Sequence, residues 1–413
     1  MISVMQAESM ILENIFPSSG EWVSLQNLRD EWLTQSVQLD QRDPRFYRVT
    51  GDGIAIAWHI WKEGHRFFSL TEQKPVQSSS LSLAKPFEGF WVNAGDPLPF
   101  GTDCVVPVAS VSIKDGMACV NNSLSLRRWD HVQRLNISGC DDQLILRQGQ
   151  HLHSPEWAVA ASLGLDGLSI AERPKISLFT VGWDRGGNDA QEQVDACSDS
   201  DESRYGILSS LQSHGFQKIE VYRLEDRFSS GRHLIQQILM DSKVLIFTDG
   251  AMQRMEQEKP DVLTLAGIEK VFRTVAQEPG SDFFFGLGPH QEFVFGLPKN
   301  PKAALIMAHR FILPALASIV SGKKPFAEKG QPRAILRQEV SRSPDMTRFV
   351  PVTIRFTESG LIEAQTIGDA EHSPQNLVGT DGFIELAPYF EANVIEMGTQ
   401  AALPLWLWRQ PWL

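Results

Sequence analysis

Residues 173–320 change repeatedly between the pattern of a buried strand and that of a helix, and this alternation restricts the possible folds more than any other feature. Apolar runs of strand length are separated by helical segments at residues 204–213, 231–240, 261–277 and 303–321. Parallel strands need long crossover connections, which are usually helices. The pattern therefore predicts an α/β domain with a doubly wound, mostly parallel sheet that helices cover on both faces.

The chain on both sides of this region has other periodicities. Residues 45–146 carry several short runs of period two, and Lys114-Asp115-Gly116 between two of these runs is typical of a hairpin turn. Residues 327–413 return to period two and predict a separate β domain. The first 35 residues have helical spacing, which predicts two helices, the second beginning at Ser24 and including Leu33.

These changes of period divide the chain into helical parts at 1–44 and 147–172, an inserted β domain at 45–146, an α/β domain at 173–326 and a β domain at 327–413. The helix of the second helical part is predicted from Ser154 to Gly164.

Composition excludes several classes of protein. Fifty acidic and 38 basic side chains leave a net charge of −12, which argues against nucleic-acid binding. The longest apolar stretch, residues 303–320, contains His309, Arg310 and Pro314 and is not expected to span a membrane. Four dispersed cysteines argue against a zinc site and for a reducing compartment, so a cytoplasmic protein is expected.

Three loops of the α/β domain are the first candidates for ligand binding, because ligands of such folds sit where strands end and helices begin. They are residues 180–185, 248–250 and 296–301. In the third loop, two prolines flank Lys299 and Asn300 and favour a rigid turn at a helix start.

Two other groups of residues have alternative interpretations. Asp199 and Glu202 have the spacing of a capping box, but their acidic cluster with Asp195 and Asp201 is also compatible with magnesium binding. His151 and His153 indicate a polar loop or a metal site that lacks a third ligand.

The C-terminus is rich in tryptophan. Trp406 and Trp408 share one face of a predicted strand and are expected to pack against the last β domain or a second subunit, whereas partner binding would require exposed indoles. Trp412 follows four residues later.

Six segments in register resemble the MoeA/gephyrin E-domain family, which inserts molybdenum into molybdopterin. They are SVMQAESMILENIFP, RDPRFYRVTGDGIAIAW, NAGDPLPFGTDCVVPV, ILRQGQHLHSPEWAVAASLGL, VFGLPKNPKAALIMAHRFILPAL and DAEHSPQNLVGTDGFIEL. The resemblance implies four domains in each subunit, in which 1–44 and 147–172 form one helical N-terminal domain, 173–326 a MogA-like α/β domain and 327–413 a C-terminal β-barrel. It also implies an elongated homodimer with its active sites between subunits. It also implies that molybdate is joined to adenylated molybdopterin with release of AMP, with molybdopterin and molybdate as substrates and Mg²⁺ as the metal.

The resemblance also implies which residues act. Asp52, Asp184 and Asp201 take catalytic positions, with Asp52 supplied by the partner subunit and magnesium bound through Asp201 and Asp184. The positions implied to bind the molybdopterin substrate are Gly182, Asp249, Gly250, Pro298, Lys299, Asn300, Pro301 and Ser373.

The sequence departs from the family where anions are expected to bind. Glu278 and Ser281 replace two lysines, Ala94 replaces a threonine and Gln257 an aspartate. Each unit of charge at about 5 Å from an oxyanion is worth roughly 3 kcal/mol at an effective dielectric near 20. Lys299 and Lys302 either restore positive charge or are solvated. The alternative to an enzyme is an impaired paralogue that binds molybdopterin or acts as a scaffold for a molybdoenzyme or another cofactor-pathway protein.

Overall fold

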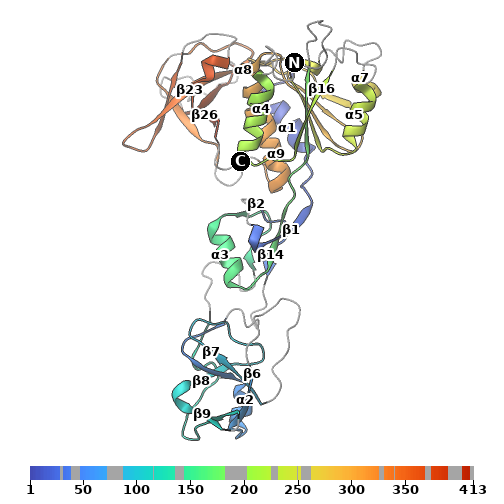
Figure 1. Cartoon of the computed structure of the whole chain (residues 1–413). Helices are drawn as coiled ribbons and strands as arrows, with labels where there is room; N and C mark the ends of the chain where they lie inside the picture. Colours follow the sequence, from blue (N-terminus) through green and yellow to red (C-terminus); the bar gives the residue numbers. More distant parts are fainter. Residues whose placement is uncertain are drawn as a thin grey trace, which may run out of the picture. The chain divides into compact units, whose positions relative to one another are not determined.

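The chain forms two compact units, one of Met1–Ser18 with Glu172–Leu413 and one of Ser19–Ala171 (Figure 1). A computed structural model describes every residue except 28–30, 39–46, 72–86, 115, 135–143, 182–201, 225–230, 249, 253–261, 325–329, 339, 368–373, 389–401 and 410–413. The four-domain division stays a prediction.

The predicted α/β fold is confirmed by a six-stranded sheet in the larger unit, with the strand order β16-β15-β17-β21-β20-β18. The first four strands are parallel: β16 (Ile219–Leu224), β15 (Ile176–Val181), β17 (Val244–Phe247) and β21 (Phe293–Gly296). The last two, β20 (Phe284–Leu287) and β18 (Glu269–Phe272), are antiparallel. The sheet is therefore mostly parallel, as expected.

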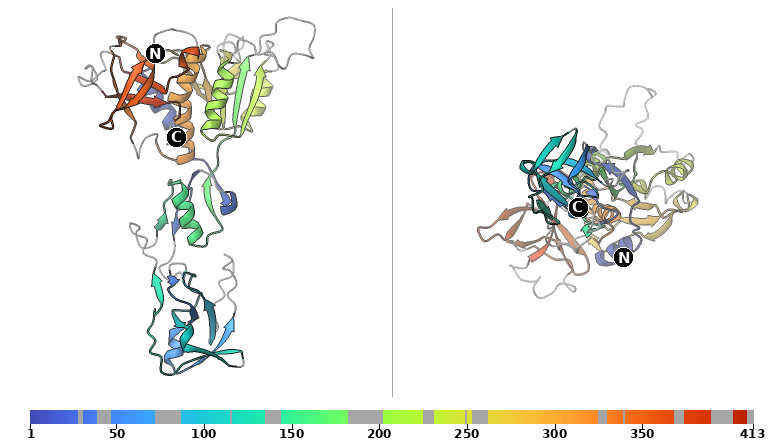
Figure 2. Two further views of the ribbon diagram at one scale, coloured as in Figure 1. Left: turned by 60° about the vertical axis from the view of Figure 1, so that its left-hand side comes forward. Right: turned by 90° about the horizontal axis from the view of Figure 1, so that it is seen from below.

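Helices cover both faces of this sheet (Figure 2). α5 (Gly231–Leu239) and α7 (Val262–Leu265) share one apolar core with Phe179, Phe247 and Phe284. α4 (Glu202–Ser213) packs against α8 (Pro301–Met307), which continues through a π-helical turn (Ala308–Ile312) into α9 (Leu313–Ser321). The prediction of a helix at 261–277 is wrong, because α7 stops before Gly267, whose φ of +86° ends it, and β18 then pairs with β20.

The helix Pro301–Ser321 is long and apolar enough to cross a membrane, but 89% of its apolar window is buried inside the protein. It is therefore accounted for as a core helix of the α/β sheet, as the sequence predicts.

Five strands of the same unit close the predicted C-terminal barrel. The ring runs through β23 (Thr347–Phe356), β24 (Ile362–Thr366), β22 (Arg333–Leu336), β26 (Ala402–Leu407) and β25 (Gly382–Leu386), which pairs again with β23. A short strand, β19 (Gln277–Glu278), joins β23 from outside the ring. A 3₁₀ turn (Pro374–Leu377) precedes β25.

The C-terminal tryptophans pack as predicted. Trp406 is 1% exposed and donates to Glu385, and the Trp408 indole donates to the Thr380 hydroxyl at 2.8 Å. Trp412 lies outside the described residues.

In the smaller unit, the prediction of a helix from Ser24 to Leu33 is wrong. β1 (Gly20–Ser24) pairs with β14 (Gly167–Ala171), and β2 (Glu31–Trp32) pairs with β13 (His151–Leu152), with a 3₁₀ turn (Leu25–Asn27) between them. β3 (Val37–Gln38) likewise pairs with β12 (Leu144–Leu146). The helix α3 (Ser154–Ser162) forms as expected, with His153 rather than Ser154 as its N-cap.

The first predicted helix is present as α1 (Val4–Glu13), but it belongs to the larger unit. Its buried residues Val4, Ala7 and Ile11 contact that unit, and Ile2 forms a bridge with Val275. Residues 1–18 therefore lie in the larger unit, because the apolar face of α1 packs against α9.

The predicted inserted β region contains a sheet of order β8-β5-β7-β6-β10-β9. Its strands are β5 (Gly53–Ile56), β6 (Phe67–Thr71), β7 (Glu88–Val92), β8 (Cys104–Pro107), β9 (Val111–Lys114) and β10 (Met117–Val120), with a 3₁₀ turn at Val108–Ser110. β9 and β10 form the predicted hairpin. The period-two run of residues 54–60 predicts one strand, but β5 ends at Ile56 and α2 (Trp58–Lys62) follows, since Asp103 accepts from the Trp58 N–H.

Candidate functional site

Two of the predicted ligand-binding loops lie side by side at the carboxyl edge of the α/β sheet. The backbone N–H of Leu297 donates to the carbonyl of Phe247 at 2.8 Å, and Met252 packs against Gly296. Gly250, whose φ is +74°, therefore lies in the loop beside the Pro298 turn. This is the edge at which ligands of doubly wound folds bind.

The altered anion loop, residues 278–282, lies at the same edge. A Cβ on Gly280 would lie 3.3 Å from Cγ of Pro298 and 3.1 Å from Cγ of Met307. The amide of Gln277 also donates to the carbonyl of Gly280 at 2.7 Å. The structure thus brings Gly250, Pro298 and this loop together.

Asn300 and Pro301 form the helix start that their spacing predicts. Asn300 is the N-cap of α8, its side-chain oxygen accepting from the Ala303 N–H at 3.2 Å, and Pro301 occupies the first turn. Lys299 is exposed, in agreement with the solvated interpretation, whereas the side chain of Lys302 is 7% exposed overall.

Sequence reasoning missed a basic partner of the altered loop. Nε of Arg348, on β23, lies 3.6 Å from a carboxylate oxygen of Glu278, and Nη1 of Arg348 donates to Ser341. Arg348 therefore balances part of the negative charge that Glu278 adds. It lies 70 residues further along the chain, and only the pairing of β19 with β23 reveals the contact.

Asp52 lies in the smaller unit, in an exposed turn held from two sides. Its Oδ1 accepts from the Ala94 N–H at 2.8 Å, and the Thr50 N–H donates to the carbonyl of His131 at 3.0 Å. His131 and Trp129 have backbone φ values of +56° and +71°, which residues other than glycine rarely adopt. No sequence signal indicated this supporting loop.

Several predicted site residues lie outside the described residues, namely Gly182, Asp184, Asp201, Asp249 and Ser373. The Asp195 and Asp199 positions of the acidic cluster, and Gln257, also lie outside them. Within the described part of the chain, no three His, Cys, Asp or Glu side chains form a group that could hold a metal. His151 and His153 contact each other there, with ring nitrogens 2.8 Å apart.

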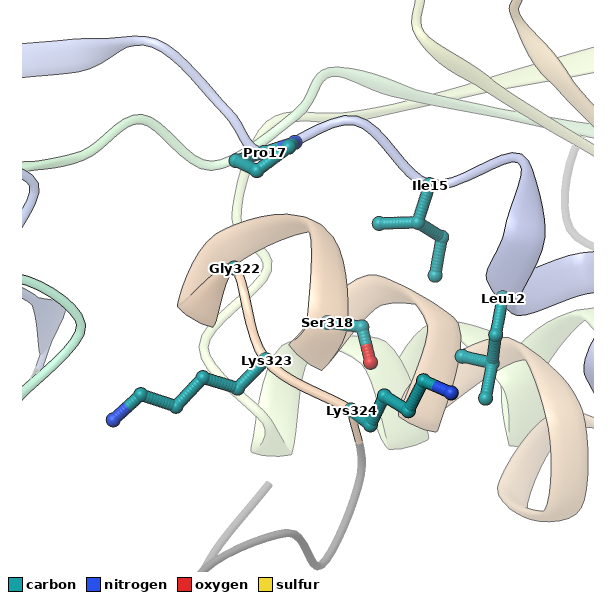
Figure 3. Close-up of a pocket in the computed structure, with 7 residues that line it drawn as sticks. All are labelled: Leu12, Ile15, Pro17, Ser318, Gly322, Lys323 and Lys324. Carbon is teal, nitrogen blue, oxygen red and sulfur yellow. The ribbon is translucent and has the colours of Figure 1, made fainter.

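A hollow of about 100 Å³ occurs at the other end of the long helix (Figure 3). It is lined by Leu12, Ile15, Pro17, Ser318, Gly322, Lys323 and Lys324. None of the predicted site residues is among them, so this hollow is not part of the candidate site.

The π-helical turn carries buried polar side chains. Arg310 pairs with Glu8 of α1 and with Glu385 of β25. Nε2 of His309 lies 3.1 Å from the Ser210 hydroxyl of α4, and its ring packs edge-on against Trp408. Burial, with a smaller effect of His214, lowers the pKa of His309 to about 3.

Stability of the larger unit is expected to fall when the pH is lowered from 7 to 5.5. The unfolded chain protonates His309 below about pH 6.5, but the folded chain does so only near pH 3, so acid favours the unfolded state by up to about 1.4 kcal/mol per pH unit. His309→Gln should remove about this much of the pH dependence in urea unfolding. His233→Gln, at an exposed position of the same unit, is the control, and equal slopes for the two variants would contradict the assignment.

The architecture and the loop assembly define a class of protein, a multidomain α/β protein whose doubly wound sheet is joined to a C-terminal β-barrel. Residues 2–164 match the profile of the MoeA N-terminal region (domain I and II). This region of the chain is thus similar to the MoeA family, and the relatives described next extend the similarity to the rest of the chain.

Named relatives span nearly the whole chain. A molybdopterin molybdenumtransferase of Synechocystis is 27% identical over 398 residues, which is 95% of this chain and 97% of that protein. One of Haemophilus influenzae is 23% identical over 94% of each chain. Among solved structures, a MoeA protein of Pyrococcus horikosii has a TM-score of 0.61 at 16% identity, covering 99% of this chain and 100% of its own, and shows that the fold is shared.

Proposed function

We propose that the protein acts in molybdenum cofactor biosynthesis as a molybdopterin molybdenumtransferase, joining molybdate to adenylated molybdopterin with release of AMP. The observation that carries the proposal is the meeting of three loops at the carboxyl edge of the sheet, those containing Gly250, Gly280 and Pro298. The near full-length match to proteins of this name supports it.

The helix start at Asn300 supplies the anion-binding end of the site. Backbone N–H groups in the first turn of a helix, together with its dipole, favour a phosphate or another oxyanion. Pro298 and Pro301 hold the chain rigid around this turn. Gly182, Asp249 and Ser373 are proposed as further contacts to the pterin substrate.

Asp52 is proposed to contact molybdate or a bound cation. The Ala94 amide occupies only one of its carboxylate oxygens, which leaves the other exposed for a ligand. We further propose a homodimer in which Asp52 of one subunit completes the α/β site of the other, in the cytoplasm. Magnesium bound by Asp184 and Asp201 would neutralise the phosphates of the substrate; this part of the proposal rests on the resemblance alone.

Asp52→Asn is expected to lower molybdate-dependent AMP release about 100-fold, because one unit of charge near the reacting groups is worth roughly 3 kcal/mol. The assay follows AMP formed from adenylated molybdopterin. Glu63→Gln, which removes an exposed carboxylate from the same unit, is the control and should leave the rate within about twofold.

The shared site is tested by mixing subunits. Subunits carrying Asp52→Asn are mixed with subunits whose site is disabled by a substitution at Pro298. The mixture should regain part of the activity, since one of the two sites in each mixed dimer is intact. A monomer in light scattering, or no regained activity, contradicts the dimeric arrangement. Normal turnover by Asp52→Asn would contradict the proposed role of Asp52. If the unmodified protein binds adenylated molybdopterin but does not turn it over, the proposed enzymatic activity is contradicted.

A further inference from the structure

A loop of the smaller unit holds two bulky residues in an unfavourable backbone conformation near Asp52. Trp129 has a φ of +71° and His131 a φ of +56°. A residue with a Cβ is strained in this left-handed region, and it stays there only where the surrounding structure enforces the conformation. Such strain is concentrated at functional sites. The loop therefore needs contacts that outweigh the cost of its backbone.

Asp103 holds the backbone of this loop. Its carbonyl accepts from the Trp129 N–H at 2.8 Å, and a carboxylate oxygen of Asp103 lies 2.9 Å from Nε of Arg128. The Val105 N–H donates to the carbonyl of Asp130 at 3.0 Å. The loop is thus tied to β8 and to the residue that precedes this strand.

The side chain of Trp129 is held by a stack on Tyr47. The two ring centroids are 4.5 Å apart, and the ring planes differ by 13°. The guanidinium carbon of Arg128 lies 5.2 Å from the centre of the Trp129 ring. Tyr47 packs against two apolar cores of the smaller unit, one containing Leu33 and the other Val105. The indole therefore rests on a ring that both cores keep in place.

The loop is connected to the Asp52 turn through the backbone. The Thr50 N–H donates to the carbonyl of His131 at 3.0 Å. The residues after His131 form β11 (Val132–Arg134), which pairs with β4 (Tyr47–Val49), the strand that leads into the turn. The approach of the chain to Asp52 therefore follows the position of this loop.

The chain after Asp52 has little freedom of its own. A Cβ on Gly53 would collide with the carbonyl oxygen of Val106, so the two backbones touch there. The Val108 N–H donates to the carbonyl of Asp52 at 3.3 Å, and the Ala94 N–H donates to its Oδ1 at 2.8 Å. With this side fixed, the direction of the carboxylate depends on how the residues before it are held.

We propose that Trp129 is a positioning residue for Asp52. Its stack on Tyr47 stabilises the left-handed backbone of the loop, and the loop holds Thr50 two residues before Asp52. Trp129 thereby affects the reaction through Asp52 and not by contact with the substrate. The consequence for the reaction rests on the proposed function, whereas the effect on the turn does not.

The effect on the turn is tested by amide hydrogen exchange of the full chain, followed in peptides that contain residues 48–53. Trp129→Leu is expected to speed exchange of the Thr50 amide about tenfold, because the acceptor of this amide is no longer held in place. Trp129→Phe keeps an aromatic ring on Tyr47 and should stay within about threefold. Trp22→Leu removes an indole that is 68% exposed on another strand of the same unit, and this control should leave the Thr50 amide unchanged.

Turnover tests whether the effect passes through Asp52. Trp129→Leu is expected to lower the kcat of AMP release about tenfold and to change the KM for adenylated molybdopterin by less than about twofold, since a small displacement of a positioned group slows the reaction strongly. In the Asp52→Asn background the same substitution should lower kcat by less than about twofold, because residues that act as a unit are not additive. Trp129→Phe should retain most of the rate.

The outcomes separate this inference from the proposed function. Unchanged exchange at Thr50, or faster exchange throughout the smaller unit, overturns the positioning role. Normal kcat of Trp129→Leu beside a slow Asp52→Asn variant overturns it as well, and so does an equal loss of kcat in the Asp52→Asn background. Faster exchange at Thr50 together with normal turnover by Asp52→Asn overturns the proposed role of Asp52 and leaves the effect of Trp129 on the turn in place.

Discussion

Replacing Arg310 with methionine is expected to lower the free energy of unfolding of the larger unit by about 3–5 kcal/mol. The Arg310 side chain is 4% exposed, with its nitrogens 2.8 Å from Glu8 and 2.9 Å from Glu385. Its guanidinium also lies 4.6 Å from the Trp406 ring. Methionine keeps much of the volume but leaves two carboxylates without their partner, one of them in a mostly buried position.

The measurement is urea unfolding monitored by near-ultraviolet circular dichroism. Arg355→Met, at an exposed position of β23, is the matched control and should change stability by less than about 0.5 kcal/mol. Adding Glu385→Gln to Arg310→Met should recover part of the loss, because one of the unpaired charges is then removed. A loss below about 1 kcal/mol for Arg310→Met would show that the buried network is not a major source of stability.

Restoring two lysines to the anion loop, as Glu278→Lys with Ser281→Lys, is expected to raise oxyanion affinity by about 10–1,000-fold. The unmodified loop carries carboxylates near the Pro298 turn, and each unit of charge at about 5 Å is worth roughly 3 kcal/mol before screening. Arg348 already balances part of the Glu278 charge, and a lysine at 278 would stand beside it. The gain in oxyanion affinity should therefore be smaller than the sum of the gains expected from each charge change alone.

Binding of molybdate and molybdate-dependent AMP release are the measurements, each at several salt concentrations. The added affinity should decrease with salt, as exposed charges are screened. Glu358→Lys with Ser359→Lys places the same charges in the exposed turn between β23 and β24 and should leave affinity within about twofold. No gain in the loop variant would show that its charge does not limit binding, and Ala94 or Gln257 would become the better candidates. We also expect the unmodified protein to release AMP more slowly than a relative with both lysines, and equal rates would contradict a limiting role of this loop.

Local pattern predicted the elements whose partners lie close along the chain. The hairpin of β9 and β10 follows from period two and a turn residue, and the helix start at Asn300 follows from its flanking prolines. Both depend on the backbone preferences of a few neighbouring residues, and the residue types alone predict these preferences. The same holds for the parallel strands β15, β16 and β17, since helices alternate with these strands along the chain.

Distant pairing decided where local pattern failed. Residues 24–33 have helical spacing, yet β1 and β2 pair with β14 and β13, more than 110 residues away. Residues 269–272 likewise form an edge strand because β20 presents a free edge to them. Backbone hydrogen bonds and burial supplied by a distant segment outweigh the small preferences of single residues.

The candidate site shows the same division. The amino-acid sequence by itself determined the residue types at the carboxyl edge: the Pro298 turn, the missing lysines of loop 278–282, and the new lysines 299 and 302. Only the tertiary structure decided that Lys299 is solvated and Lys302 buried, and that Arg348 stands beside Glu278. Charge is a property of a side chain, but its effect depends on burial and on neighbours that the fold brings from elsewhere in the chain.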